Sequence, residues 1–192
     1  MIKIIIGIFI IGTGMLSYFK GQIARRAEIK KEEAQEVYVI AHYQRTVEIA
    51  TQFLMENEGF RATPYFCPGG KKTIGYGDTL IFNDQPDLER VSRDFAEIRL
   101  NSMITDIYNR IPNKMKYRYT PEQTAAIIAL IYRVGFTGLI ESRLFYYLSM
   151  SQPNMKIIEK EWLEFQMVKN KKILSKRAER EFSLFYYGEM IV

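Results

Sequence analysis

EGFRATPYFCPGGKKTIGYG, residues 58–77, is the stretch of sequence that decides the fold. Its Pro-Gly-Gly triplet is a strong turn signal, and it separates two short pieces rich in aromatic and β-branched residues. Two such pieces around a turn are typical of a β-hairpin. We therefore predict two antiparallel strands, at residues 62–66 and 72–76.

The sequence before this stretch is helical in character. Lys, Glu, Gln and Ala dominate residues 20–36, and these residue types favour a helix. No proline or glycine lies between residues 22 and 58, and Gly59 is a typical helix stop. An apolar stripe with spacings near three, four and seven is made of Val37, Ile40, Ala41, Val47, Ala50 and Leu54. We predict a helical stalk over residues 20–45 and a compact domain over residues 46–192.

The sequence after residue 86 is helical again, with breaks near Pro112, Thr120-Pro121, residues 135–138 and Pro153. Thr120 precedes Pro121, a pattern typical of a helix that begins with a threonine N-cap. The predicted fold class is therefore α+β. It is mostly helical, with a small antiparallel sheet near the N-terminal side of the domain and an apolar helix before it. His42, the only histidine, is expected at the helix surface or the edge of the core.

Residues 4–19, IIIGIFIIGTGMLSYF, form an uncharged and mostly apolar run. As a helix the run would be about 24 Å long, against a hydrocarbon core of about 30 Å. No A-x-A pattern follows it, and no cysteine lies where a lipoprotein signal would need one. We expect residues 1–19 to be an uncleaved signal anchor or transmembrane helix in the inner membrane. The alternative is a buried helix of the soluble fold.

The charges that flank this run conflict with export. Only Lys3 precedes it, whereas five basic residues follow it: Lys20, Arg25, Arg26, Lys30 and Lys31. Under the positive-inside rule such a flank keeps the following domain in the cytoplasm.

Composition narrows the classes of partner and cofactor. A net charge of +5 suits polyanions such as nucleic acid, anionic lipid or bacterial wall polymers. No basic stripe with interleaved aromatic residues stands out, so nucleic acid is not an expected partner. A single cysteine and a single histidine exclude an internal disulfide and a zinc cluster, so no metal and no cofactor are expected.

Residues 58–77 resemble the active-site signature of the phage-type lysozymes. That family has a Glu-Gly pair, an Asp or Cys after eight intervening residues, and a Thr after five more that opens Thr-Ile-Gly-Tyr-Gly. Glu58, Cys67 and Thr73 fall at these spacings. The resemblance continues through residues 121–135, Ser142, Trp162 and residues 174–181, and it covers roughly residues 48–185.

The resemblance implies a lysozyme-like fold and a peptidoglycan hydrolase. Such an enzyme cleaves the β-1,4 bond between N-acetylmuramic acid and N-acetylglucosamine, for host-cell lysis or wall penetration. It implies three catalytic residues, Glu58, Cys67 and Thr73, and three substrate-binding residues, Tyr65, Tyr76 and Arg133. A carboxyl group at a helix end that faces a partly apolar cleft can hold a proton near neutral pH, which is what a general acid needs. Thr73 is expected to hold the attacking water.

Three positions depart from the family pattern. Cys67 stands where an Asp is frequent, Asp78 where His is common, and Arg133 where many relatives have Asn. A free thiol is mostly protonated at pH 7 and is then a poor base. Asp78 is expected to alter a structural ion pair near the sheet, and Arg133 to alter the cleft wall.

Two biological settings and one different function stay open. The enzyme is expected in the host inner membrane facing the periplasm, or released to the periplasm. Alternatively it is virion-associated or part of a secretion machine, with its apolar N-terminus docked in a partner protein. The other function is a non-catalytic, membrane-tethered or virion-docked module that binds glycan, and the cysteine at position 67 is its main support.

Overall fold

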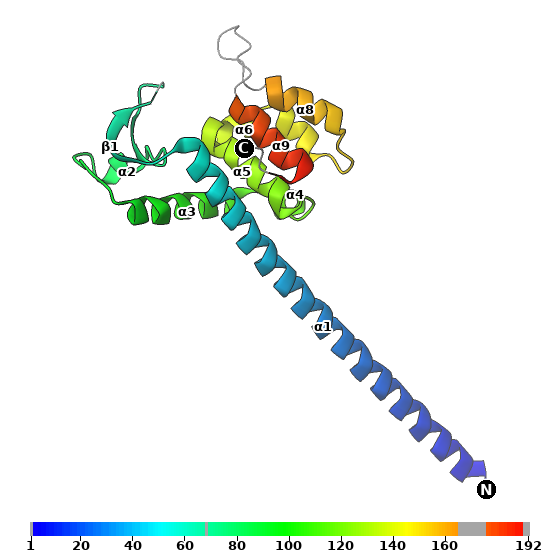
Figure 1. Cartoon of the computed structure of the whole chain (residues 1–192). Coiled ribbons are helices and arrows are strands. Elements are labelled where there is room, and N and C mark those ends of the chain that lie inside the picture. Colours follow the sequence, from blue (N-terminus) through cyan, green and yellow to red (C-terminus); the bar gives the residue numbers. More distant parts are fainter. Residues whose placement is uncertain (1, 68, 165–175, 190–192) are drawn as a thin grey trace. The chain divides into compact units, whose positions relative to one another are not determined.

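The computed structural model describes residues 2–67, 69–164 and 176–189, with the backbone alone for residues 2–19 (Figure 1). The chain divides into two compact units, Met1–Ala41 and His42–Val192. The predicted stalk and domain, residues 20–45 and 46–192, differ slightly from this division and stay predictions.

The first unit consists of the N-terminal part of one long helix, α1 (Ile2–Glu58). The apolar stripe predicted for this helix is wrong at its N-terminal end, because Val37 is 66% exposed and Ile40 is 48% exposed. The side chains of the predicted signal anchor, residues 1–19, lie outside the described residues. Within the described part of the chain, no helix has both the length and the apolar character needed to cross a bilayer.

The second unit begins where α1 enters a hydrophobic core. Ala50, Phe53 and Leu54 are fully buried there, so the C-terminal half of the predicted stripe is confirmed. His42 is also buried, at 2% exposed, and the expectation of a surface or core-edge position is wrong. It is buried because both ring nitrogens have partners: Nδ1 lies 3.1 Å from the Tyr108 hydroxyl and Nε2 lies 3.1 Å from the Tyr119 carbonyl.

The predicted hairpin is confirmed. Strand β1 (Arg61–Phe66) pairs antiparallel with β2 (Lys72–Gly75), and Tyr65 lies opposite Thr73. The turn between them is closed by two backbone hydrogen bonds, from the Cys67 N–H to the Lys71 carbonyl at 3.0 Å and from the Gly70 N–H to the Cys67 carbonyl at 2.8 Å.

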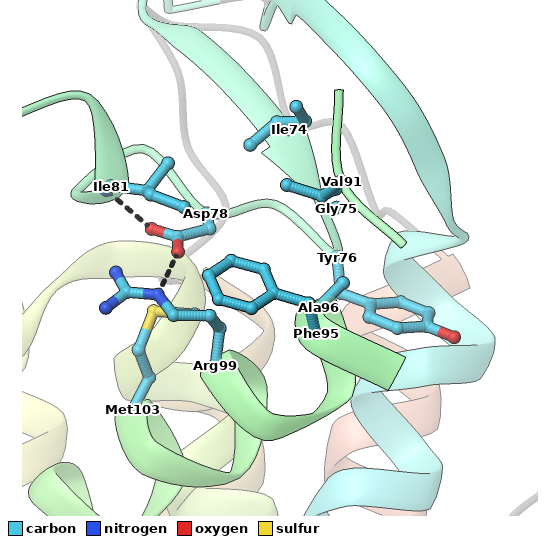
Figure 2. Close-up of a pocket in the computed structure, with 10 residues that line it drawn as sticks. All are labelled: Ile74, Gly75, Tyr76, Asp78, Ile81, Val91, Phe95, Ala96, Arg99 and Met103. Carbon is cyan, nitrogen blue, oxygen red and sulfur yellow. Dashed lines mark hydrogen bonds and ion pairs between the residues drawn. The ribbon is translucent and has the colours of Figure 1, made fainter. Parts of the chain in front are cut away.

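The hairpin is tied to the short helix α2 (Ile81–Asp84) and to α3 (Arg93–Arg110) through Asp78. One carboxylate oxygen of Asp78 accepts hydrogen bonds from the N–H groups of Leu80 and Ile81, and the other accepts from Nε of Arg99 at 2.9 Å (Figure 2). The aspartate that departs from the family pattern therefore holds the backbone at the start of α2 and ties it to α3.

The remaining helices gather around α5 (Pro121–Val134), which packs against α3, α6 (Phe136–Ile140) and α9 (Lys176–Tyr187). The predicted N-cap is confirmed, because Thr120 and Gln123 form a capping box. Residues 124–131 are all buried, as a central helix requires.

Three further helices complete the domain: α4 (Asn113–Lys116), α7 (Arg143–Ser149) and α8 (Met155–Glu164). Ser142 caps α7 by accepting a hydrogen bond from the Phe145 N–H. Trp162 of α8 is fully buried against the ring of Phe185, at 5.1 Å between centroids. The predicted α+β class, mostly helical with a two-stranded antiparallel sheet, is thus confirmed.

Candidate active site

Glu58 is the last residue of α1, and it is positioned by the end of that helix. Gly59 takes φ +66° and closes the helix with a bond from its N–H to the Met55 carbonyl. The Glu58 side chain is 17% exposed, and its Oε1 lies 2.7 Å from Nη2 of Arg177 in α9. The contact is an ion pair without the angles of a hydrogen bond, because Nη2 of Arg177 has no aligned acceptor. The carboxyl group is thus held by a cation while one side remains open to solvent.

Gly77 lies against the other carboxylate oxygen of Glu58. A Cβ atom at Gly77 would be 3.3 Å from Oε2 of Glu58, and the φ of +90° also favours glycine here. The Tyr132 hydroxyl holds this turn in place by donating to the Tyr76 carbonyl at 2.7 Å. Burial raises the pKa of Tyr132, and the nearby Glu58 carboxylate raises it further. Helix α5 therefore fixes the turn after β2 beside the end of α1.

Cys67 and Thr73 come together at the far end of the hairpin. The Thr73 hydroxyl is buried and donates to the Lys71 carbonyl at 2.8 Å. The pKa of the Cys67 thiol is lowered, mainly by a hydrogen bond from the Lys71 backbone and to a lesser extent by one from the Gly69 backbone. Cys67 is half-buried. The hairpin therefore favours the thiolate form of Cys67, which a neutral apolar pocket would not do.

Tyr65 interacts electrostatically with both Glu58 and Cys67. It lies opposite Thr73 in the hairpin, and the Arg61 guanidinium lies 4.4 Å from its ring centroid. Burial raises the pKa of Tyr65, the charge of Glu58 raises it further, and Cys67 has a smaller effect in the same direction. The phenol is therefore within electrostatic reach of both Glu58 and Cys67.

A family model for phage lysozyme matches residues 55–181. This chain belongs to the phage lysozyme family. The matched residues contain α1's last turn, the hairpin and every helix down to α9, so the predicted family membership is confirmed.

Relatives with known sequences or structures agree with this membership. An endolysin of Acyrthosiphon pisum secondary endosymbiont phage 1 is 30% identical over 87 residues, which cover 45% of this chain. The chain matches 58% of that endolysin's length.

Two solved structures share the fold at 19% identity each and a TM-score of 0.59. One is the endolysin from Escherichia coli O157:H7 phage FAHEc1. The match covers 77% of this chain and 94% of the endolysin chain. The other is the muramidase domain of SpmX from Asticaccaulis excentricus. The match covers 71% of this chain and 94% of the SpmX chain. The predicted lysozyme-like fold is confirmed.

Two of the predicted substrate-binding residues of this phage lysozyme have partners within the protein. Tyr76 is 2% exposed, and its hydroxyl accepts from Nη1 of Arg93 at 2.9 Å. Arg133 binds Glu181 with two contacts, Nε to Oε1 at 3.0 Å and Nη2 to Oε2 at 2.6 Å. The substrate-binding roles of Tyr65, Tyr76 and Arg133 stay predictions.

The sequence analysis gave no role at the site to Arg177, Glu181 and Tyr132, although all three lie in stretches that resemble the family. A weak signal existed for the first two, because residues four apart on a predicted helix face each other. Nothing in the sequence pairs either of them with Glu58 or Arg133.

The hollows lined by described residues include two beside α3 that lie away from these side chains. One is an interior gap of about 10 Å³ between β2 and α3, lined by Ile74, Gly75, Tyr76, Asp78, Ile81, Val91, Phe95, Ala96, Arg99 and Met103 (Figure 2). Such a volume holds at most one water molecule. The other, of about 440 Å³, opens along α1 and α3 between Glu48 and Asn101. Neither of these two hollows is lined by Glu58, Cys67 or Thr73.

Proposed function

We propose that this phage lysozyme hydrolyses peptidoglycan by cleaving the β-1,4 bond between N-acetylmuramic acid and N-acetylglucosamine. The observation that carries the proposal is the half-shielded Glu58 carboxyl group, which lies against the Gly77 turn while Cys67 and Thr73 pair at the end of the same hairpin. Family membership gives independent support.

Glu58 is the proposed general acid. A sugar alkoxide is a poor leaving group, so the glycosidic oxygen needs a proton as its bond to C1 breaks. Only 17% of the Glu58 side chain is exposed, and its Oε1 contacts Nη2 of Arg177. The proposed acid is thus shielded from bulk solvent and held in place by α9.

Cys67 and Thr73 are proposed to handle the attacking water. The Thr73 hydroxyl donates its hydrogen bond to the Lys71 carbonyl, so its oxygen lone pairs are available to accept a hydrogen bond from water. The water oxygen bonds to C1 as the leaving oxygen takes the Glu58 proton, and the water proton passes to the Cys67 thiolate. The lowered pKa of Cys67 supports this role, because more of the thiol is ionised and able to accept that proton.

Host-cell lysis or wall penetration is the proposed biological role, with bacterial peptidoglycan as the partner. Two similar proteins are named endolysins, in agreement with this role. We propose that the enzyme acts in the periplasm, on the outer face of the inner membrane or released from it, and that residues 4–19 serve its export. A virion-associated enzyme is the second setting, and the basic residues after position 19 favour it.

A non-catalytic glycan-binding module is the second candidate function. Its support is the cysteine at position 67, because a protonated thiol is a poor base. The retained Glu58 and Thr73 favour the enzyme.

The deciding experiment uses the purified full-length chain on isolated peptidoglycan, with release of reducing ends as the readout. Glu58→Gln is compared with Glu56→Gln, an exposed glutamate two residues earlier on α1. We expect release by the wild type and Glu56→Gln, and none by Glu58→Gln, because an amide cannot donate the required proton. Muramic acid at the new reducing ends identifies a muramidase. No release by any folded protein would favour the glycan-binding module.

Cys67 is tested by two substitutions in the same assay. Cys67→Ser replaces a group that ionises easily with one that does not, so we expect a rate loss of roughly a hundredfold. Cys67→Asp restores a carboxylate base, so we expect it to retain more activity than the serine variant. Equal activity of wild type and Cys67→Ser would remove the thiolate from the mechanism.

A further inference from the structure

We propose that the buried pair Glu181–Arg133 is a positioning device, which sets the charge around Glu58 by holding Arg177. The inference rests on the proposed function, since its effect is read through Glu58 as the general acid. Neither Glu181 nor Arg133 contacts the reacting atoms in this proposal. Both act through Arg177.

The four charged groups form a chain of contacts. Glu58 Oε1 lies 2.7 Å from Nη2 of Arg177, and Nε of the same arginine donates to Oε1 of Glu181 at 3.1 Å. Oε1 of Glu181 also accepts from Nε of Arg133, and its Oε2 lies 2.6 Å from Nη2 of Arg133. Glu181 is therefore shared by two guanidinium groups, one of which holds Glu58.

Burial makes this arrangement specific. The Glu181 side chain is fully buried, and Arg133 and Arg177 are 19% and 20% exposed. A carboxylate in such surroundings is costly unless cations pair with it, so Glu181 fixes both arginines in place. Arg177 contacts Glu58 through Nη2 and Glu181 through Nε, so it is shared between two acidic side chains.

The cluster is also connected to the hairpin through α5. Arg133 follows Tyr132, whose hydroxyl holds the Tyr76 carbonyl and lies beside the Gly77 turn. Consecutive residues of one helix therefore fix both neighbours of Glu58, the turn on one side and α9 on the other. Among the described residues, three elements supply the charged and titratable groups that interact with Glu58 or with its partner Arg177: Tyr65 of β1, Tyr132 and Arg133 of α5, and Arg177 and Glu181 of α9.

The sign of the expected effect follows from charge. A general acid must be protonated, so activity is lost as pH rises past the point where Glu58 ionises. Replacing Glu181 with Gln removes a negative charge and leaves Arg177 to Glu58 alone, which favours the ionised acid. The alkaline limb of the activity profile should then move to lower pH. Replacing Arg133 with Gln removes a positive charge from the cluster and should move the same limb to higher pH.

The test measures kcat/KM against pH on isolated peptidoglycan for the full-length chain, Glu181→Gln and Arg133→Gln. We expect the alkaline limb to move by about one pH unit, downward for Glu181→Gln and upward for Arg133→Gln. The double variant removes both charges and should return the limb close to its wild-type position. Glu161→Gln is the matched control, since this nearly buried glutamate pairs with Arg143 at 3.0 Å in a different part of the domain.

Two results would overturn the proposal. One is an unchanged alkaline limb in folded variants of an active wild type. The other is a shift of the alkaline limb in the same direction for Glu181→Gln and Arg133→Gln. The two variants remove opposite charges, so a shared direction would indicate a loss of packing and not an electrostatic effect. If Glu181→Gln does not fold, the upward shift of Arg133→Gln and its reversal in the double variant decide the question. A wild type without muramidase activity would instead count against the proposed function.

Discussion

Glu58 and Arg177, 119 residues apart in the chain, meet at 2.7 Å between Oε1 and Nη2. Because Arg177 also pairs with the buried Glu181, it stabilises two carboxylates from different helices at once. This relationship predicts a stability effect that is separate from catalysis.

We expect Arg177→Gln to lower the free energy of unfolding by about 2–3 kcal/mol, because it leaves Glu181 with one cation fewer in the interior. Urea denaturation followed by circular dichroism gives the value. Arg180→Gln is the control one turn along α9. Its partner Glu56 is 43% exposed, so we expect a loss of less than about 1 kcal/mol. Equal losses for the two variants would contradict the assignment of Arg177 to a buried network.

The Gly77 position predicts a steric effect on the proposed general acid. We expect Gly77→Ala to lower muramidase activity by more than about tenfold, because the new methyl group would lie 3.3 Å from Oε2 of Glu58 and displace it. The φ of +90° adds a backbone cost of about 1–2 kcal/mol.

A matched control separates the two effects. Gly188→Ala introduces a side chain at φ +72°, where the neighbouring atoms are 3.8 Å away or farther and belong to Glu122. We expect a stability loss of the same order in both variants, and an activity loss in Gly77→Ala alone. Activity measured on peptidoglycan per folded molecule makes the comparison, and normal turnover by Gly77→Ala would refute it.

The lowered pKa of Cys67 predicts its reactivity. Iodoacetamide reacts with the thiolate, so the alkylation rate should reach half of its maximum at a lower pH than for a model thiol in solution. Thr73→Val removes the hydroxyl that donates to the Lys71 carbonyl and so loosens the turn whose Lys71 backbone lowers this pKa, and we expect the midpoint to rise. Thr63→Val, at an exposed position of β1, serves as the control and should leave the midpoint unchanged. Mass spectrometry follows the reaction, and an unshifted midpoint in Thr73→Val would show that the Thr73 hydroxyl does not support this turn.

His42 is the first residue of the second unit, and its buried hydrogen bonds are expected to stabilise that unit. The Tyr119 carbonyl can only accept, so Nε2 of His42 carries the proton and Nδ1 accepts from the Tyr108 hydroxyl. We expect His42→Leu to lower the free energy of unfolding by about 2 kcal/mol, because a buried carbonyl and a buried hydroxyl lose their partner. Gln44→Leu changes an exposed position of the same helix and should have little effect. Thermal unfolding of both variants makes the comparison.

Local features of this fold could be predicted from the sequence. The turn at residues 67–71, the end of α1 at Gly59 and the capping box of α5 each depend on a few consecutive residues, whose conformational preferences are strong. The alignment of Glu58, Cys67 and Thr73 depended on spacing within 16 residues, and the hairpin does bring Cys67 and Thr73 together.

Tertiary features could not be predicted in the same way. The partner of Arg133 could not be predicted, because Glu181 is 48 residues away and on another helix. The expected place of Arg133 at the substrate stays a prediction. Val37 and Ile40 continue an apolar periodicity but are exposed, since periodicity identifies a face without identifying what covers it. His42 was misplaced for the converse reason, because its burial depends on acceptor and donor groups from residues 108 and 119.

Trp162 is the single tryptophan of the chain, and it lies fully buried against Phe182 and Phe185 of α9. Its fluorescence therefore comes from one site, where α8 packs against α9, the helix that carries Arg177 and Glu181. Detachment of α9 would shift the emission to longer wavelength even while the other helices keep their far-ultraviolet circular dichroism. The protein thus contains a natural optical probe for the helix that holds its proposed general acid, and no label needs to be introduced.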